Sequence, residues 1–288
     1  MQEHHRPSPS VVVGVDGSRA AVHAALWAAD EAVSRDIPLR LICAIPPDGT
    51  AQIDARNEAR KRATAELAVR YALEAVEATE KPVKIEVAII EGLPARTLVD
   101  ASRSAAMICM GPVGASHFAP GRVGSTAATV AKSARCPAAI IRWTDRASSA
   151  ERGAILAVVG KVPDSNAVLQ TAIDEALLRG ARLCVLTMWQ SRSDDVHDGR
   201  AAFDGTHDAQ AQLDRLVHAW GRRYPDVAIS ALAVHGSLVH HLVNNPDSIQ
   251  LVVMGACDRD VAELVGPAGN AALQAKDCSV LIVSSQHL

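Results

Sequence analysis

Three glycines and the residues beside them have the types and spacing of a phosphate-binding loop. Gly111 and Gly114 follow a short apolar run, and nine residues later come Gly124, Ser125 and Thr126. Glycine lets a backbone approach a phosphate closely, and a helix that begins at serine or threonine offers N–H groups and a positive dipole end to an anion. The spacing G-x2-G-x9-G-S-T therefore favours nucleotide binding over a purely structural loop, although each glycine taken singly could simply form a turn.

A second candidate loop, Gly14-Val15-Asp16-Gly17-Ser18, follows a β-branched run near the N-terminus. That run does not alternate between apolar and polar residues, which is typical of a strand buried on both faces of a parallel sheet. The glycines of this loop would let its backbone approach a ligand closely. We therefore expect the two loops to act together.

Alternating strands and helices must position these loops. Strands are predicted at residues 11–15, 39–45, 83–90, 106–110 and 138–142. Helices are predicted at residues 18–34, 51–78, 94–104 and 125–134. This alternation predicts an open parallel sheet with right-handed crossovers and the strand order 3-2-1-4-5. Ligands bind such sheets beyond the carboxyl ends of strands one and four, where the order reverses, and the two loops follow those strands.

The same order begins again in the second half of the chain. Gly236 and Gly255 lie 144 positions after Gly92 and Gly111. Strands are predicted at residues 155–159, 183–188, 227–234, 251–254 and 280–283, with helices at 165–179 and 206–224. A repeat of this length is a duplicated domain and not a solenoid unit. The sequence therefore predicts two tandem α/β domains, residues 1–146 and 147–288, with the boundary in the polar stretch 144–152.

Composition narrows the class of protein. The chain has 288 residues, 49% of them hydrophobic and 21% charged, which is typical of an ordinary globular protein. The net charge of −3 argues against nucleic acid as the main partner. No apolar run is long enough to span a bilayer and the N-terminus is polar, so we expect a cytoplasmic protein without membrane contact. The scattered cysteines form no CxxC pair, which favours buried thiols over zinc or disulfides.

On these residues the chain resembles a tandem universal stress protein. The G-x2-G-x9-G-(S/T) spacing, the GVDGS opening, the Gly92-Leu93-Pro94 turn and the Arg-Cys-Pro corner before strand five all fit that family. The resemblance implies that Asp16 lies against the ribose or adenine and that Ala44 and Met110 line the adenine pocket. It also implies ATP as cofactor, usually with Mg²⁺, with the phosphates held by Gly111, Gly114, Gly124, Ser125 and Thr126.

The second half departs from the motif. Asp258 occupies the position of the second glycine, and Gly266-Pro267 replaces Gly124-Ser125 in a loop two residues shorter. Proline removes an N–H that would face a phosphate, and an aspartate repels an anion. The loop after the first strand, residues 160–164, has no aspartate directly equivalent to Asp16. We therefore expect the second half to be a structural or regulatory partner that binds no ATP in the usual pose.

Other functions remain open at this point. A slow ATPase is one alternative, since His117 and Arg122 could contact a γ-phosphate, but neither a P-loop nor a group that would orient water stands out. A scaffold without nucleotide is another. The apolar segments 138–141 and 280–283 would invite pairing as edge strands, and the resemblance implies pairing through the fifth strands, as an internal pseudo-dimer or a homodimer. The resemblance implies a nucleotide-dependent regulator in the stress response, with a protein partner that the sequence does not identify.

Overall fold

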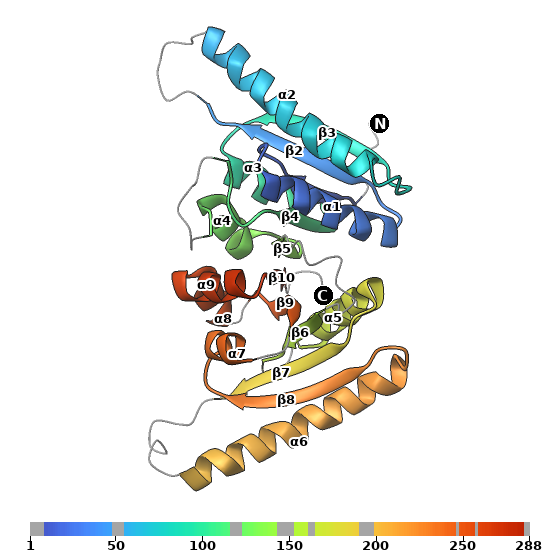
Figure 1. Cartoon of the computed structure of the whole chain (residues 1–288), viewed down its shortest axis with the longest axis vertical. Helices are drawn as coiled ribbons and strands as arrows, with labels where there is room; N and C mark the ends of the chain where they lie inside the picture. The colour runs from blue at the N-terminus through green and yellow to red at the C-terminus, as the bar shows by residue number, and fades with distance from the viewer. Residues whose placement is uncertain are drawn as a thin grey trace, which may run out of the picture. The chain divides into compact units, whose positions relative to one another are not determined.

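The chain divides into an N-terminal unit (Met1–Trp143) and a C-terminal unit (Thr144–Gln286). The computed structural model describes residues 9–47, 55–115, 123–142, 153–160, 165–189, 199–245, 248–256 and 259–284. Both units are α/β folds in which helices cover the two faces of a parallel sheet (Figure 1). The predicted fold class is therefore confirmed.

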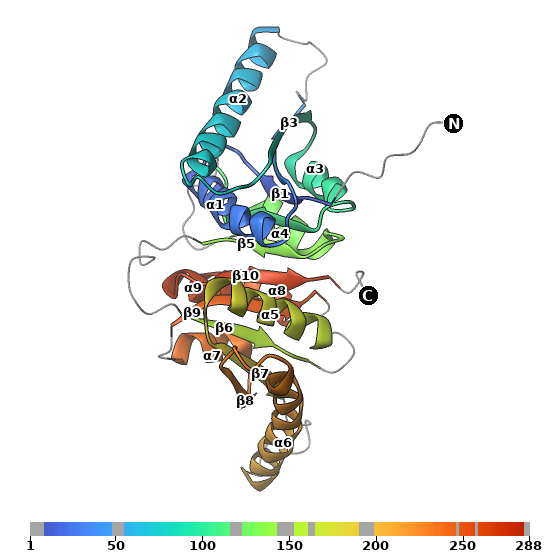
Figure 2. The ribbon, with the colours of Figure 1, turned by 90° about the vertical axis from the view of Figure 1, so that its right-hand side faces the viewer.

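Five parallel strands form the sheet of the N-terminal unit in the order β3-β2-β1-β4-β5. The strands are β1 (Val11–Gly14), β2 (Leu39–Ile45), β3 (Ile85–Glu91), β4 (Met107–Met110) and β5 (Ala138–Ile140). The helices are α1 (Arg19–Ser34), α2 (Ala55–Glu77), α3 (Pro94–Ala101) and α4 (Ser125–Ser133). Helices α1 and α2 lie on one face of the sheet and α3 and α4 on the other (Figures 1 and 2). The carboxyl ends of β1 and β4 are adjacent, so the loops that follow them meet.

Close packing of α1 explains how these loops are held. Its buried face consists mainly of alanines, among them Ala21, Ala24, Ala25, Ala28 and Ala32. Small side chains let the helix lie close to the central strands β1 and β4, which are themselves buried along their length. The start of α1 is thereby fixed beside the ends of those strands.

The C-terminal unit repeats this arrangement, with strand order β8-β7-β6-β9-β10. Its strands are β6 (Ala154–Val158), β7 (Leu183–Trp189), β8 (Ile229–His235), β9 (Ile249–Gly255) and β10 (Ser279–Val283). Its helices are α5 (Ser165–Arg179), α6 (Gly199–Arg223), α7 (Leu238–Asn244), α8 (Arg259–Val265) and α9 (Pro267–Ala275). Helix α6 begins seven residues before the predicted start at 206, and the sequence reasoning had assigned no helix after it.

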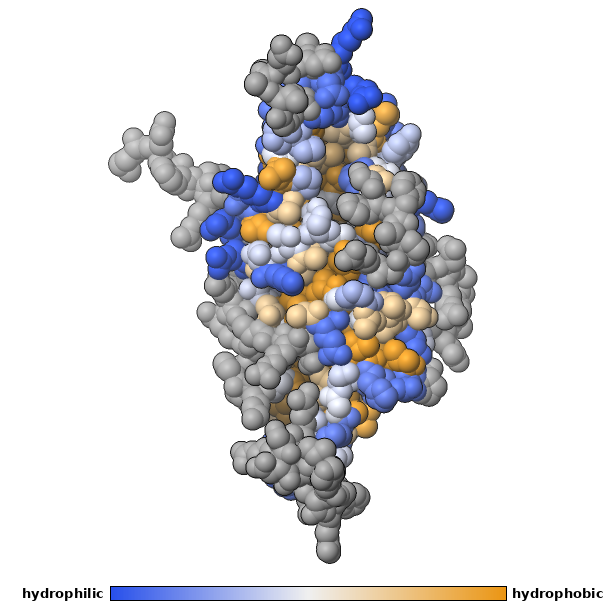
Figure 3. Space-filling view, turned by 90° about the vertical axis from the view of Figure 1, so that its left-hand side faces the viewer, coloured by the Kyte–Doolittle hydropathy of each residue, from blue (hydrophilic) through white to orange (hydrophobic). Residues whose placement is uncertain are grey.

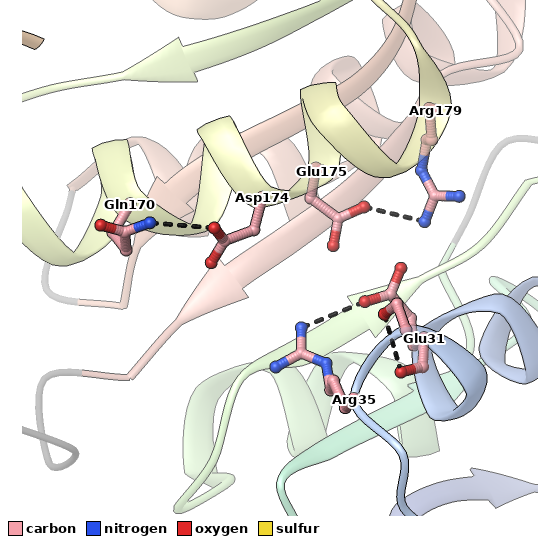
Figure 4. A network of polar contacts seen from close by, with 7 residues as sticks. Glu31, Arg35, Gln170, Asp174, Glu175 and Arg179 are labelled. Carbon is pink, nitrogen blue, oxygen red and sulfur yellow. Dashed lines mark hydrogen bonds and ion pairs between the residues drawn. The ribbon is translucent and has the colours of Figure 1, made fainter. Parts of the chain in front are cut away.

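The duplication extends to individual side chains. Glu31 forms an ion pair with Arg35 at 3.1 Å in α1, and Glu175 forms one with Arg179 at 2.8 Å in α5 (Figure 4). Both glutamates are buried, and both pairs have the i, i+4 spacing at which helix side chains meet. The second pair lies 144 positions after the first, as Gly236 and Gly255 do after Gly92 and Gly111.

Among the described residues, no helix has the length and apolar character needed to cross a bilayer.

Candidate functional site

The loop between β1 and α1 is organised by Asp16 and Ser18. One oxygen of Asp16, Oδ1, accepts a hydrogen bond from the Ser18 backbone N–H at 3.0 Å. Ser18 is the N-cap of α1, and its hydroxyl accepts from the Ala21 N–H at 3.1 Å. Asx turns and serine caps of this kind are local motifs, so the GVDGS sequence by itself dictates this loop shape.

The loop between β4 and α4 is closed by its own backbone. The N–H of Gly124 donates to the carbonyl of Pro112 at 2.8 Å, which brings the two ends of the glycine motif together. Gly111, at the start of the loop, lies against α1. A Cβ built on Gly111 would be 2.6 Å from the Ala20 Cβ and 2.9 Å from the Ala20 carbonyl carbon, so packing against α1 requires glycine there.

Helix α4 begins beside this loop. Its N-cap, Gly124, has no side chain that could accept a hydrogen bond from the first turn. The N–H groups at the start of a helix have no partner within the helix and carry the positive end of its dipole. Ser125 and Thr126 add two hydroxyl groups at the same place. The start of α4, Gly124-Ser125-Thr126, is therefore suited to binding an anion.

A hydrogen bond connects the two loops across 99 positions of sequence. The second oxygen of Asp16, Oδ2, accepts from the Ala115 N–H at 2.8 Å. Gly114 lies directly beside this contact, because a Cβ built on it would be 2.5 Å from the same oxygen. The Asp16 carboxylate thus occupies the space that a side chain at position 114 would need.

The two loops border one cavity of about 790 Å³ at the carboxyl ends of the strands. All eight residues that the sequence singled out line it, namely Asp16, Ala44, Met110, Gly111, Gly114, Gly124, Ser125 and Thr126. Ala44 and Met110 belong to an apolar part of the wall, whereas the glycines contribute backbone and the start of α4 contributes the first N–H groups of a helix. A planar apolar group joined to an anion matches this division of the surface.

Helix α2 supplies a wall that the sequence reasoning missed. Arg60, Lys61, Thr64, Ala65 and Ala68 line the cavity from one face of this helix. The Lys61 ammonium donates to the Pro46 carbonyl at 3.1 Å, at the end of β2. At the end of the molecule where Figure 1 shows α2, the coloured surface in Figure 3 is mostly hydrophilic. In the sequence, the signal that could have identified this wall is that these five residues are small or polar and recur at helical spacing.

The charges around the cavity are unequal. Arg60 and Lys61 are cationic, and Asp16 is the one acidic residue among the described residues of the wall. Burial, together with the nearby Asp16 charge, raises the pKa of the Cys43 thiol on β2 to about 11. Cys43 is therefore a neutral thiol at pH 7, and the cavity as a whole suits an anionic ligand.

The C-terminal unit has a different structure at the equivalent place. Gly266 is the N-cap of α9, as Gly124 is of α4, so the two glycines correspond as the sequence indicated. Pro267, however, takes the first helical position of α9. Helix α8, which the sequence reasoning had not assigned, runs up to this point, and the Gly266 N–H donates to the carbonyls of Ala262 and Glu263. Gly269 of α9 packs against the backbone of α8. The Gly124 N–H is also paired, with the Pro112 carbonyl, so the two units differ at the next residue, where Pro267 has no N–H in place of Ser125.

Some predicted contacts fall outside the described residues. His117, Arg122, Asp258 and the residues 161–164 of the first loop of the C-terminal unit belong to this group. In the described part of the chain, no three His, Cys, Asp or Glu side chains lie close enough together to hold a metal ion.

Comparison with known proteins gives a consistent result over the whole chain. The profile of the universal stress protein family matches residues 9–142 and again residues 151–284. The chain is 45% identical over its full length to universal stress protein Rv2028c of Mycobacterium tuberculosis, and all of that protein is covered. It is 43% identical to universal stress protein Rv3134c of the same organism, with 98% of each chain covered.

A solved structure supports the fold. The crystal structure of a universal stress protein from Archaeoglobus fulgidus matches with a TM-score of 0.68, at 15% identity and with 96% of each chain covered. With two family domains in tandem, and relatives alike from end to end, this chain belongs to the universal stress protein family.

Proposed function

We propose that the N-terminal unit binds ATP or a related adenine nucleotide, and that the chain is a nucleotide-dependent regulator with one such site. The observation that carries the proposal is that the eight residues expected at the site line a single cavity. Membership of the universal stress protein family supports a role in the stress response, with a protein partner that nucleotide occupancy would recruit or release.

The cavity divides into parts that fit the parts of a nucleotide. Phosphates would lie against the backbone of Gly111, Gly114 and Gly124 and at the start of α4, where the positive end of the helix dipole favours an anion. The adenine would lie against the apolar wall formed by Ala44 and Met110. Asp16, between these two parts, would contact the ribose.

Magnesium would enter with the phosphates. Mg²⁺ prefers oxygen ligands in octahedral geometry and is usually bound through substrate phosphates and one or two protein groups. The hydroxyls of Ser125 and Thr126 and the carboxylate of Asp16 are the oxygen donors of the wall that could supplement phosphate oxygens. The role of the ion there would be to neutralise phosphate charge.

The C-terminal unit supports a stoichiometry of one nucleotide per chain. Pro267 takes the first position of α9, where the N-terminal unit has Ser125, and has no N–H to offer a phosphate. Sequence places Asp258 where the N-terminal unit has Gly114, which adds repulsion to an anion. Binding of ATP to the N-terminal unit alone is therefore expected.

Isothermal titration calorimetry with ATP and AMP, paired with a Ser125→Pro variant, tests the proposal. Pro267 stands after Gly266 at the start of α9, so the fold accepts this sequence, and Gly124 already has the extended backbone (φ −61°, ψ 150°) that a residue before proline requires. The variant removes one N–H and one hydroxyl that would face phosphate. A lost hydrogen bond to a charged group is worth about 1.5–3 kcal/mol, so ATP affinity should fall roughly 10- to 100-fold.

Two controls make the result specific. Ser125→Ala keeps the N–H and loses only the hydroxyl, so its affinity for ATP should lie between those of Ser125→Pro and the wild type. Unchanged thermal unfolding without ligand shows that Ser125→Pro is folded, and ligand at 100 times Kd should add about 2.7 kcal/mol to the wild type. Absence of ATP binding by folded, nucleotide-free wild type would favour a scaffold instead. Two ATP per chain would contradict the single site, and phosphate release at a steady rate would favour a slow ATPase.

A further inference from the structure

Asp16 makes contacts that a residue serving only as a ligand contact would not need. Its two carboxylate oxygens accept N–H groups from different loops, Ser18 at 3.0 Å and Ala115 at 2.8 Å. Bonds from a backbone N–H to a carboxylate are charge-assisted and stronger than neutral ones. Both bonds join atoms of the protein alone, so they belong to the architecture of the site.

We propose that Asp16 is a positioning residue that fixes the β4–α4 glycine loop through the Ala115 N–H, and that Gly114 must be glycine because the Asp16 carboxylate fills the place of its side chain. The second glycine of the motif is then required by the protein itself before any phosphate approaches. A Cβ at position 114 would be 2.5 Å from Asp16 Oδ2, well inside the shortest contacts that real Cβ atoms make.

The other glycines of the motif provide a contrast. A Cβ at Gly124 would meet its nearest atom, the Pro112 carbonyl oxygen, at 3.5 Å, which is ordinary contact. A Cβ at Gly111 would meet Ala20 of α1 instead of Asp16. The requirement at position 114 is thus specific to the carboxylate, and removal of the carboxylate should remove it.

The C-terminal unit carries the reverse combination. The hydrogen bond from Val159 N–H to the Leu186 carbonyl corresponds to that from Val15 N–H to the Ile42 carbonyl, 144 positions earlier. In this register Gly160 is the counterpart of Asp16. Counted along the sequence with the same offset, Asp258 is the counterpart of Gly114. The unit that lacks the aspartate also lacks the glycine, as a steric link between the two positions predicts.

The inference deepens the proposed function, because a fixed glycine loop prepares the phosphate site, but it is tested without nucleotide. Thermal unfolding of the ligand-free full chain is measured for Gly114→Ala, Asp16→Ala and the double variant. Gly114→Ala should lower Tm by about 3 °C or more in the presence of Asp16, as expected for an overpacked contact. The same substitution should change Tm by about 1 °C or less when Asp16 is alanine. Equal shifts in both backgrounds would overturn the steric link.

Amide hydrogen exchange at Ala115 tests the positioning role independently. In ligand-free wild type the Ala115 N–H should exchange about 10-fold or more slowly than in Asp16→Ala. Asp16→Asn keeps one acceptor oxygen and should give intermediate protection, and it should keep the penalty of Gly114→Ala because it is isosteric. Unprotected Ala115 in wild type would refute the inference even if the variants failed to fold. Protection and coupling in a protein that binds no ATP would uphold it while the proposed function fails.

Discussion

Replacement of Gly111 by alanine tests whether the first glycine of the motif serves packing. The added methyl group would lie 2.6 Å from the Ala20 Cβ and 2.9 Å from its carbonyl carbon. Both atoms are fixed to the backbone of α1, so no side-chain rotation can relieve the contact. Carbon atoms pack at about 3.5–4.0 Å, so the loop or the helix must move by about 1 Å.

The expected cost follows from two opposing effects. Overpacking of a well-packed contact costs about 1–3 kcal/mol. Alanine also restricts the unfolded chain relative to glycine, which returns about 0.4–1 kcal/mol. We therefore expect Gly111→Ala to lower the free energy of unfolding by about 1–2 kcal/mol. For a domain of this size the loss corresponds to a fall in Tm of about 4–8 °C.

Gly124→Ala is the matched control. Among the described residues, its Cβ would meet no atom closer than 3.5 Å, and its φ of −61° and ψ of 150° are open to alanine. The poorer N-cap and the restricted unfolded chain roughly cancel, so stability should change by less than about 0.5 kcal/mol. Urea and thermal unfolding of the ligand-free full chain measure both variants. If Gly111→Ala unfolds as the wild type does, or if Gly124→Ala loses as much, the assignment of Gly111 to packing is wrong.

Two further predictions concern charge and protonation. Lys61→Ala should weaken ATP binding about 3- to 10-fold because it removes a cation from the cavity wall. Lys61→Arg keeps the charge and should bind ATP nearly as the wild type does. Calorimetry at two salt concentrations measures the loss of affinity, which should be smaller at high salt. Burial raises the pKa values of Cys43 and Cys136 from 9.0 to about 11 and about 12. The unfolded thiols therefore release protons above pH 9 while the folded ones keep them, so stability should fall as pH rises above 9. Urea midpoints between pH 8 and 10.5 should show less of this loss in Cys43→Ala, and an equal loss in that variant would contradict the assignment.

The sequence by itself determined the architecture and the position of the candidate site. Short β-branched runs such as VVVGV and the helical spacing of the alanines of α1 are local patterns, and local patterns indicate strand or helix. The alternation of strands and helices then dictated parallel pairing and placed the two glycine loops at one edge. The 144-residue offset between Gly111 and Gly255 revealed the duplication without any structure.

Tertiary structure decided what each residue of the site does. The bond from Ala115 to Asp16 joins positions 99 residues apart, and no local pattern encodes such a contact. Gly111, Gly114 and Gly124 look alike in the sequence. Yet Gly111 packs on α1, Gly114 makes room for a carboxylate, and Gly124 is in ordinary contact with the Pro112 carbonyl. That Arg60 and Lys61 of α2 line the cavity could not be predicted from the sequence for the same reason. Periodicity tells which face of a helix is buried, whereas only the packed sheet determines which atoms that face meets.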